Sequence, residues 1–267
     1  MGEDVTSIAE AGPDPQQSGE QQLDIHRPKP IHGWREFAKE VGIIVLGVLI
    51  ALAGEQLVET YREREMAASA AEAINGELIA SAANAAMRIA LDDCIRGRIA
   101  QLSARLAATG DQWSADPMPF AVHLPGMPVL PMAYSVPRTP HVTSAWDMAV
   151  ANGLSRYMPR TRSEDYADLY LNITALNGYQ QKEESLAAEL QPLAQTRRLD
   201  TRSAYEAARA LGSLDDLNSS VVFASHVILA QIKRLGIDIP RAEETLKPAM
   251  KVQKQLRGAC VKPIVME

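Results

Sequence analysis

The cysteines are the side chains here that most plainly predict a covalent bond. The chain has two, Cys94 and Cys260. Cys94 falls within a long stretch of helical apolar spacing, and Cys260 lies just beyond the last predicted helix of the chain. If the domain that contains them lies outside the cytoplasm, the thiols tend to oxidise. The resulting bridge would close a large loop, which the chain-entropy model values at about 4–5 kcal/mol. The alternative interpretation, two unrelated buried thiols, stays open.

The remaining candidates for chemistry do not form a recognisable site. Two cysteines without a nearby histidine are too few ligands for zinc. The sequence contains no H-E-x-x-H, Walker A, G-x-S-x-G or G-x-G-x-x-G motif. We therefore predict no catalytic residue, no metal site and no cofactor, and we do not expect an enzyme. The histidines stand singly, at His26, His32, His123, His141 and His226.

Three pairs of adjacent acidic residues also occur, at Asp92-Asp93, Glu183-Glu184 and Asp215-Asp216. Neighbours in a helix point about 100° apart, so two adjacent carboxylates are poorly placed to share an active site. We interpret all three pairs as solvated faces or helix starts.

The element that decides where these residues lie is the apolar run from Val41 to Gly54. As a helix the run would be about 21 Å long, which is short of the roughly 30 Å hydrocarbon layer. With its flanks included, residues 37–58 would cover about 33 Å. The sequence predicts a transmembrane helix over 34–58, held in the lipid bilayer. A buried helix of a soluble protein is one alternative.

A second alternative is a cleaved export signal. The small-x-small pattern at Ala51-Leu52-Ala53 would allow release after Ala53. Against cleavage, 40 residues precede the apolar run, and Glu36 and Glu40 stand where a signal peptide carries positive charge. The anchor is therefore the preferred interpretation.

Lysine and arginine predict the orientation. Cytoplasmic flanks of membrane spans are enriched in these residues. This rule predicts a cytoplasmic amino terminus and a carboxy-terminal domain outside the cytoplasm. Residues 1–33 are rich in Gln, Glu, Pro and Gly, which predicts a disordered tail. Four basic residues precede the span and only two follow it at a similar distance: Arg27, Lys29, Arg35 and Lys39, then Arg62 and Arg64.

Small residues mark one face of the predicted span. Gly47, Ala51 and Gly54 are spaced by four and three, so they share one helix face. Such a stripe allows a second helix to approach closely, which would give a homodimer through the membrane. The alternative is that glycine and alanine are simply common in membrane spans. Both interpretations stay open.

The rest of the chain predicts an all-α fold. Residues 59–110 read as a long amphipathic helix, with a bend expected at Gly76 or Gly97. A proline-rich loop, 111–142, carries apolar side chains that we expect to drape over the helices. A helical bundle, 143–267, is predicted to pack on 74–108. Its helices are expected at about 143–158, 161–195, 201–212, 213–235 and 240–257.

Two stretches carry a resemblance to known proteins. "REFAKEVGIIVLGVLIALAGEQLVE", Arg35 to Glu59, resembles the amino-terminal segment of uncharacterised bacterial membrane-anchored proteins. "SAWDMAVANGLSRYMP", Ser144 to Pro159, resembles a tryptophan-containing helix of the same group. The resemblance implies a bacterial inner-membrane protein with an external helical domain. It implies no activity and no functional residues.

Composition limits the remaining function classes. The net charge is −6 and there is no long basic run, which argues against nucleic-acid binding. The expected function is a membrane-anchored, non-enzymatic binding or scaffolding protein with an unknown protein partner. One alternative is a ligand-sensing domain that needs a partner for output. The other is a soluble periplasmic protein released after Ala53.

Overall fold

The computed structural model describes residues 33–118, 131–137, 139–264 and 266. It is 80% helical, which confirms the all-α prediction. The predicted tail falls almost entirely outside the described residues, as does the middle of the proline-rich loop. The α-helices in the described part are α1 (Trp34–Ala90), α2 (Asp92–Ala108), α3 (Ser144–Ala151), α4 (Arg160–Glu189), α5 (Thr201–Arg234) and α6 (Ile239–Arg257).

Short elements complete the described part of the chain. Three 3₁₀ helices cover Leu154–Tyr157, Gln191–Ala194 and Gly258–Cys260. Two strands of two residues each, β1 (Gln112–Trp113) and β2 (Arg197–Arg198), pair antiparallel, with Trp113 opposite Arg197.

The chain divides into two compact units, and the boundary falls within α1, after Glu55. In the first unit, every described residue is exposed. Helix α1 contains an 18-residue window with a mean hydropathy of 2.3, none of it buried. Its length and composition are those of a helix that crosses a membrane, and a signal sequence near the amino terminus would share both properties.

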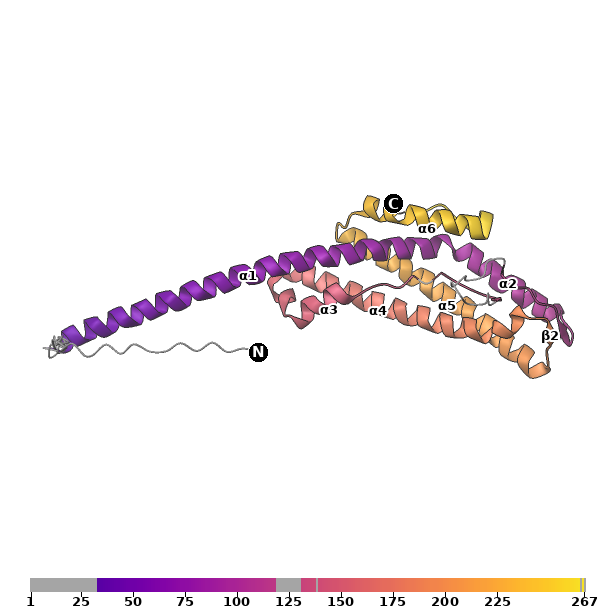
Figure 1. Ribbon diagram of the computed structural model, residues 1–267, viewed down its shortest axis with the longest axis horizontal. Coiled ribbons are helices and arrows are strands. Elements are labelled where there is room, and N and C mark those ends of the chain that lie inside the picture. The colour runs from indigo at the N-terminus through magenta and orange to yellow at the C-terminus, as the bar shows by residue number, and fades with distance from the viewer. Residues whose placement is uncertain (1–32, 119–130, 138, 265, 267) are drawn as a thin grey trace, which may run out of the picture. The chain divides into compact units, whose positions relative to one another are not determined.

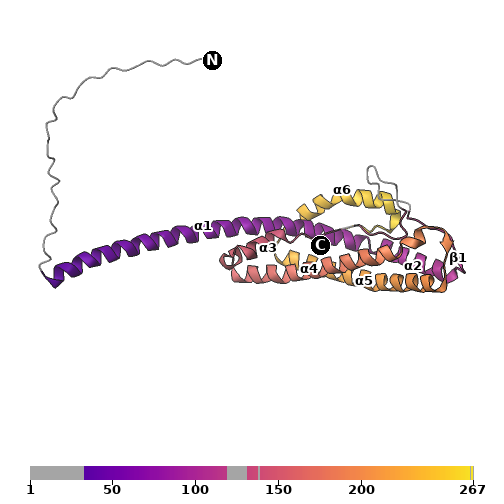
Figure 2. The ribbon, with the colours of Figure 1, turned by 60° about the horizontal axis from the view of Figure 1, so that its bottom comes forward.

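The second unit, residues 56–267, is a helical bundle. Helices α4 and α5 lie side by side, and α6 lies on the opposite side of α1 from them (Figures 1 and 2). Alanines on α1 let the helices approach closely, and larger aliphatic side chains fill the centre. Fully buried core residues include Ile74, Leu78, Ala82, Ala85, Leu102, Ile173, Leu176, Leu214 and Ile228.

The predicted long amphipathic helix is interrupted at Leu91. The sequence predicts a bend at a different position, Gly76 or Gly97. The backbone N–H of Lys262, in the carboxy-terminal tail, donates to the carbonyl of Ala90 (2.9 Å). This contact occupies the carbonyl at the point where the helix stops. The positions of the glycines did not predict this interruption, because it coincides with a contact from a part of the chain that is distant in sequence.

The predicted boundary between helices 201–212 and 213–235 is wrong, since α5 is one helix. Its buried stripe continues past Gly212, and this packing outweighs the weak helix propensity of one glycine. The helix predicted at 143–158 ends early, because Gly153 adopts a left-handed conformation with φ of 68°. The helix predicted at 161–195 ends at Glu189, three residues before Pro192.

The described parts of the 111–142 segment pack on the helices, as the sequence predicts. The buried indole of Trp113 donates from Nε1 to the carbonyl of Leu193 (2.8 Å). The side chains of Tyr134 and His141 are also buried. These described parts therefore belong to the core of the second unit.

Candidate binding pocket and buried polar network

A buried ion pair joins three helices. The Nη2 group of Arg88, on α1, donates to Oε1 of Glu183, on α4 (2.6 Å), and to Oδ1 of Asn218, on α5 (2.8 Å). Arg88 is 2% exposed and Glu183 is 1% exposed. Removing one member would leave a buried charge without its partner, so the pair constrains how the three helices pack.

The network continues from Asn218 toward the surface. Asn218 Nδ2 donates to Oδ1 of Asp92 (2.6 Å), in the first turn of α2. Asp92 in turn forms an ion pair with Arg96 (2.9 Å), whose Nη2 donates to the Ser219 hydroxyl (3.3 Å). Asp92 therefore lies at the start of α2, inside the single long helix that the sequence predicts, and also contacts α5 through Asn218.

Burial sets the electrostatics of this network. Loss of hydration raises the pKa of Glu183, and the positive charge of Arg88 opposes that rise. The Tyr134 hydroxyl donates to Oε1 of Glu183 (3.3 Å), and burial together with the negative charge of Glu183 raises the pKa of this tyrosine. With these side chains enclosed, the network is suited to fixing the bundle rather than to contacting a ligand.

Our interpretation of Glu183 as a solvated residue is wrong. Glu183 follows Leu176 by seven residues and precedes Leu186 by three. This spacing places it on the apolar stripe of α4, and the same spacing could have predicted its burial. Glu184, beside it, is partly buried.

A second polar cluster positions α3. Oε1 of Glu77, on α1, accepts from the Ser144 hydroxyl (2.7 Å) and from the backbone N–H of Ala145 (2.8 Å). The Tyr170 hydroxyl donates to the other oxygen of Glu77 (2.9 Å), and Trp146 stacks on the Tyr170 ring at 5.7 Å. A carboxylate from α1 thus binds the free amide at the start of α3.

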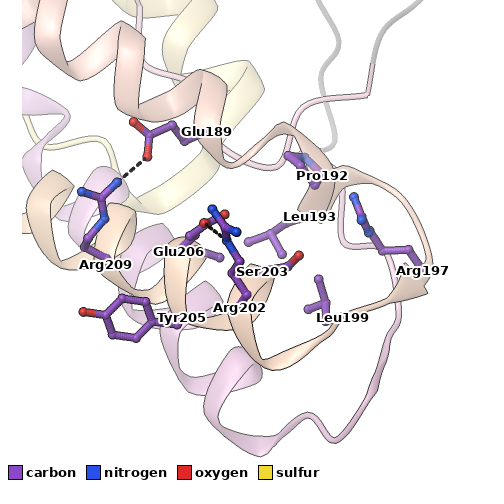
Figure 3. Close-up of a pocket in the computed structure, with 11 residues that line it drawn as sticks. Glu189, Pro192, Leu193, Arg197, Leu199, Arg202, Ser203, Tyr205, Glu206 and Arg209 are labelled. Carbon is purple, nitrogen blue, oxygen red and sulfur yellow. Dashed lines mark hydrogen bonds and ion pairs between the residues drawn. The ribbon is translucent and has the colours of Figure 1, made fainter.

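The candidate ligand site is a pocket of about 690 Å³ at the junction of α4 and α5. Figure 3 shows that it is formed by the end of α4, the following 3₁₀ helix, β2 and the start of α5. Pro192, Leu193 and Leu199 provide an apolar surface. Charged side chains line the remainder: Glu189, Arg197, Arg202, Glu206 and Arg209.

Two of these arginines have carboxylate partners. Arg202 forms an ion pair with Glu206 (2.9 Å), and Arg209 forms one with Glu189 (3.4 Å). Within the described ranges, the guanidinium of Arg197 has neither an ion pair nor a hydrogen bond. Among the described residues, Arg197 is thus a cation without an ion-pair partner within 4 Å, next to an apolar wall, although the charge of Asp200 acts on it. This arrangement suits a carboxylate or phosphate attached to an apolar group.

The sequence did not predict this pocket. Its residues Glu189, Pro192 and Leu193 come from the predicted end of a long helix, 161–195, whereas the chain turns at Pro192. The proline itself was the available signal, because it cannot donate to the preceding turn of a helix.

The residues singled out from the sequence are dispersed. Cys94 and Cys260 form the predicted disulfide, with Cα atoms 5.0 Å apart. Gly47, Ala51 and Gly54 are exposed, with no heavy atom within 4 Å of a Cβ added at either glycine, so self-association through this face stays a prediction.

Among the described residues, the histidines and acids are not gathered into one site. His141 is buried and His226 is exposed, whereas His26, His32 and His123 lie outside the described residues. Within the described part of the chain, no three histidine, cysteine, aspartate or glutamate residues are grouped so that they could hold a metal ion.

Comparison with known proteins adds no relative. No family model, no curated protein and no solved structure matches this chain. The functional argument therefore rests on the residues and the geometry described above.

Proposed function

We propose that this protein is a single-span protein of the bacterial inner membrane that binds an anionic ligand through its periplasmic helical domain. The observation that carries the proposal is the exposed apolar surface of α1 before Glu55. Burying apolar surface is worth about 25 cal/mol per Å². The stretch would therefore be costly to leave in water, and a bilayer is the environment that its length and composition fit.

Carbonate extraction tests the anchor. The full-length chain is expected to stay in the vesicle fraction at high pH, and a Leu46→Asp variant is expected to be released in part. On the insertion scale, aspartate at the centre of a span costs about 2.5–3.5 kcal/mol. Release of the unmodified chain by carbonate would refute the anchor.

Amino-terminal sequencing of the protein purified from whole cells separates an anchor from a cleaved signal. A chain that begins at Gly54 would favour the released periplasmic protein. A reporter fused after Glu267 tests orientation, and we expect a periplasmic signal. A cytoplasmic signal would contradict the positive-inside argument.

Binding is proposed to occur in the pocket beside Arg197. The unpaired guanidinium would hold the anionic group of the ligand, and Leu193 and Leu199 would contact its apolar part. Among ligand classes, this arrangement favours small amphipathic acids over neutral molecules.

The probe for this pocket is 4-phenylbutyrate, and its uncharged analogue 4-phenylbutanol is the control. Isothermal titration into the detergent-solubilised full chain should detect the acid and not the alcohol. A hydrogen bond to a charged group contributes about 1.5–3 kcal/mol. Arg197→Gln should therefore weaken binding at least about tenfold.

Arg160→Gln is the matched control variant, because Arg160 is an exposed arginine outside the pocket. It should bind the acid as the unmodified chain does. Equal affinity for the acid and the alcohol, or equal loss in both variants, would rule out recognition by Arg197.

A further inference from the structure

The outer face of α4 and α5 carries apolar side chains that no described residue covers. Phe223, on α5, is 71% exposed, and Leu171, on α4, is 69% exposed. Tyr179, two turns after Leu171, is also exposed. Isolated apolar side chains are common on protein surfaces, but these three lie along two helices that pack side by side.

This face is hollowed between the helices. A groove of about 450 Å³ runs between α4 and α5, with Tyr179 and Phe223 among its lining residues. Its other lining includes the small side chains of Ala175, Ser220 and Ala224. The face thus combines protruding aromatic rings with a groove lined by small residues.

The charges on this face follow an ordered pattern. Asp168 lies near the start of the exposed stripe of α4, and Lys182 lies toward its end. On α5 the order is the same, with Asp216 before the groove and Arg234 after it. Among the described residues, none of these four side chains forms an ion pair.

Side-chain hydrogen bonds fix how the two helices align. Asn172, on α4, donates to Gln231, on α5 (2.9 Å). Arg88 contacts Glu183 and Asn218 together, so these two residues lie at the same height. Since the helices run antiparallel, Asp168 is level with the end of α5, where Arg234 lies. Lys182 lies within about one helical turn of the height of Asp216.

We propose that this face binds a second copy of the chain, around a twofold axis that runs along the groove between α4 and α5. Such a rotation keeps every residue at its own height and places α4 of one copy opposite α5 of the other. Asp168 then faces Arg234 of the second copy, and Lys182 faces Asp216 of the second copy. All four charges gain a partner of opposite sign.

The shape of the face favours a second copy over an unrelated partner. A twofold interface must be complementary to itself, because the same patch is used on both sides. Here one patch supplies both the protruding ring of Phe223 and the groove that could receive it. The same rotation leaves both Gln56 ends on one side of the dimer, as two copies in one membrane would require. The inference does not depend on the ligand proposed for the Arg197 pocket.

Cysteine cross-linking tests the interface directly. The two native cysteines are already joined to each other, so one introduced cysteine is the only free thiol. Differently tagged full-length chains carrying Asp168→Cys and Arg234→Cys are co-expressed and oxidised with copper phenanthroline. We expect a covalent heterodimer. The control pairs Asp168→Cys with Glu243→Cys, an exposed position on α6, and should give at most a trace.

A substitution in the centre of the face gives the second test. Phe223→Glu should abolish the Asp168–Arg234 cross-link and weaken self-association at least about a hundredfold in sedimentation equilibrium. Tyr205→Glu is the matched control, because Tyr205 is similarly exposed near the start of α5, away from the groove. It should leave both readouts unchanged. Cross-linking through Glu243→Cys as efficient as through Arg234→Cys, or a cross-link that survives Phe223→Glu, would overturn the proposal.

Discussion

His141 should make the stability of this protein depend on pH in a way that one substitution removes. The side chain is 4% exposed. Its backbone N–H donates to Oδ1 of Asn177 (3.1 Å), and its carbonyl accepts from Nδ2 of the same residue (2.8 Å). These bonds hold the residue in place, while neither ring nitrogen has a hydrogen-bond partner within the described part of the chain.

Burial without a partner disfavours the charged imidazolium and lowers the pKa of His141 from 6.5 to about 4. In the unfolded chain the imidazole therefore takes up its proton at a higher pH than in the folded chain. The contribution of His141 to stability is complete above pH 6.5 and is lost as pH falls toward 4. A difference of about 2.5 pKa units, at 1.36 kcal/mol each, corresponds to about 3 kcal/mol.

The substitution His141→Leu removes the titrating group and keeps an apolar side chain of similar size. Urea unfolding of the full chain in detergent, followed by tryptophan fluorescence, is measured at pH 7 and pH 4. Other groups also titrate between these values, but they are common to both proteins. The unmodified chain should lose about 3 kcal/mol more than the variant over this range.

His226→Leu is the control, because His226 is exposed on α5. This variant should show the same dependence on pH as the unmodified chain, within about 0.5 kcal/mol. If His141→Leu also follows the unmodified chain from pH 7 to pH 4, then His141 is not buried as a neutral group, and the reasoning fails.

Three further predictions concern the packing of the bundle, and each is measured by urea unfolding. Arg88→Met should lower the free energy of unfolding by about 3–5 kcal/mol, because it leaves the Glu183 carboxylate unpaired. The double change with Glu183→Leu should lower it by less. A larger loss for the double change would contradict this. Replacing Cys94 and Cys260 by serine should cost up to about 5 kcal/mol, given a loop of 166 residues, and unchanged stability would argue against the bridge. Gly212→Ala should stabilise α5 by about 0.5–1 kcal/mol, since an added Cβ meets no heavy atom within 4 Å; a loss would indicate strain at that position.

Local patterns predicted the helical class well. In the sequence, apolar residues recur at helical spacing along α4 and along the second half of α5, and they are buried in the structure, including Leu169, Ile173 and Ile228. Such spacing reports directly on which side chains face a core. The disulfide was predicted from the expected compartment, where thiols tend to oxidise, and not from the sequence spacing of the two cysteines. The predicted packing of the carboxy-terminal bundle on the long helix allowed Cys94 and Cys260 to lie close together.

Features that depend on distant contacts were missed. Nothing near Leu91 in the sequence marks an interruption, because the contact made there comes from Lys262. The pairing of Glu183 with Arg88 was missed for the same reason, although the position of Glu183 on an apolar stripe was visible. The pocket beside Arg197 depends on the turn at Pro192, a residue that the predicted helix 161–195 wrongly included.

The tail and the buried ion pair meet at one place on the bundle. Arg88 lies two residues before Ala90, whose carbonyl binds the tail, and six residues before the Cys94 bridge. Without the bridge, weaker contacts such as the Lys262–Asp93 ion pair (2.8 Å) would hold the tail at Ala90, and α1 could continue through Leu91 whenever they break. That change would rotate Asp92 relative to Asn218, to which it is hydrogen-bonded. Breaking the bridge should therefore weaken the network around Arg88, so the energetic effects of the two changes should not add.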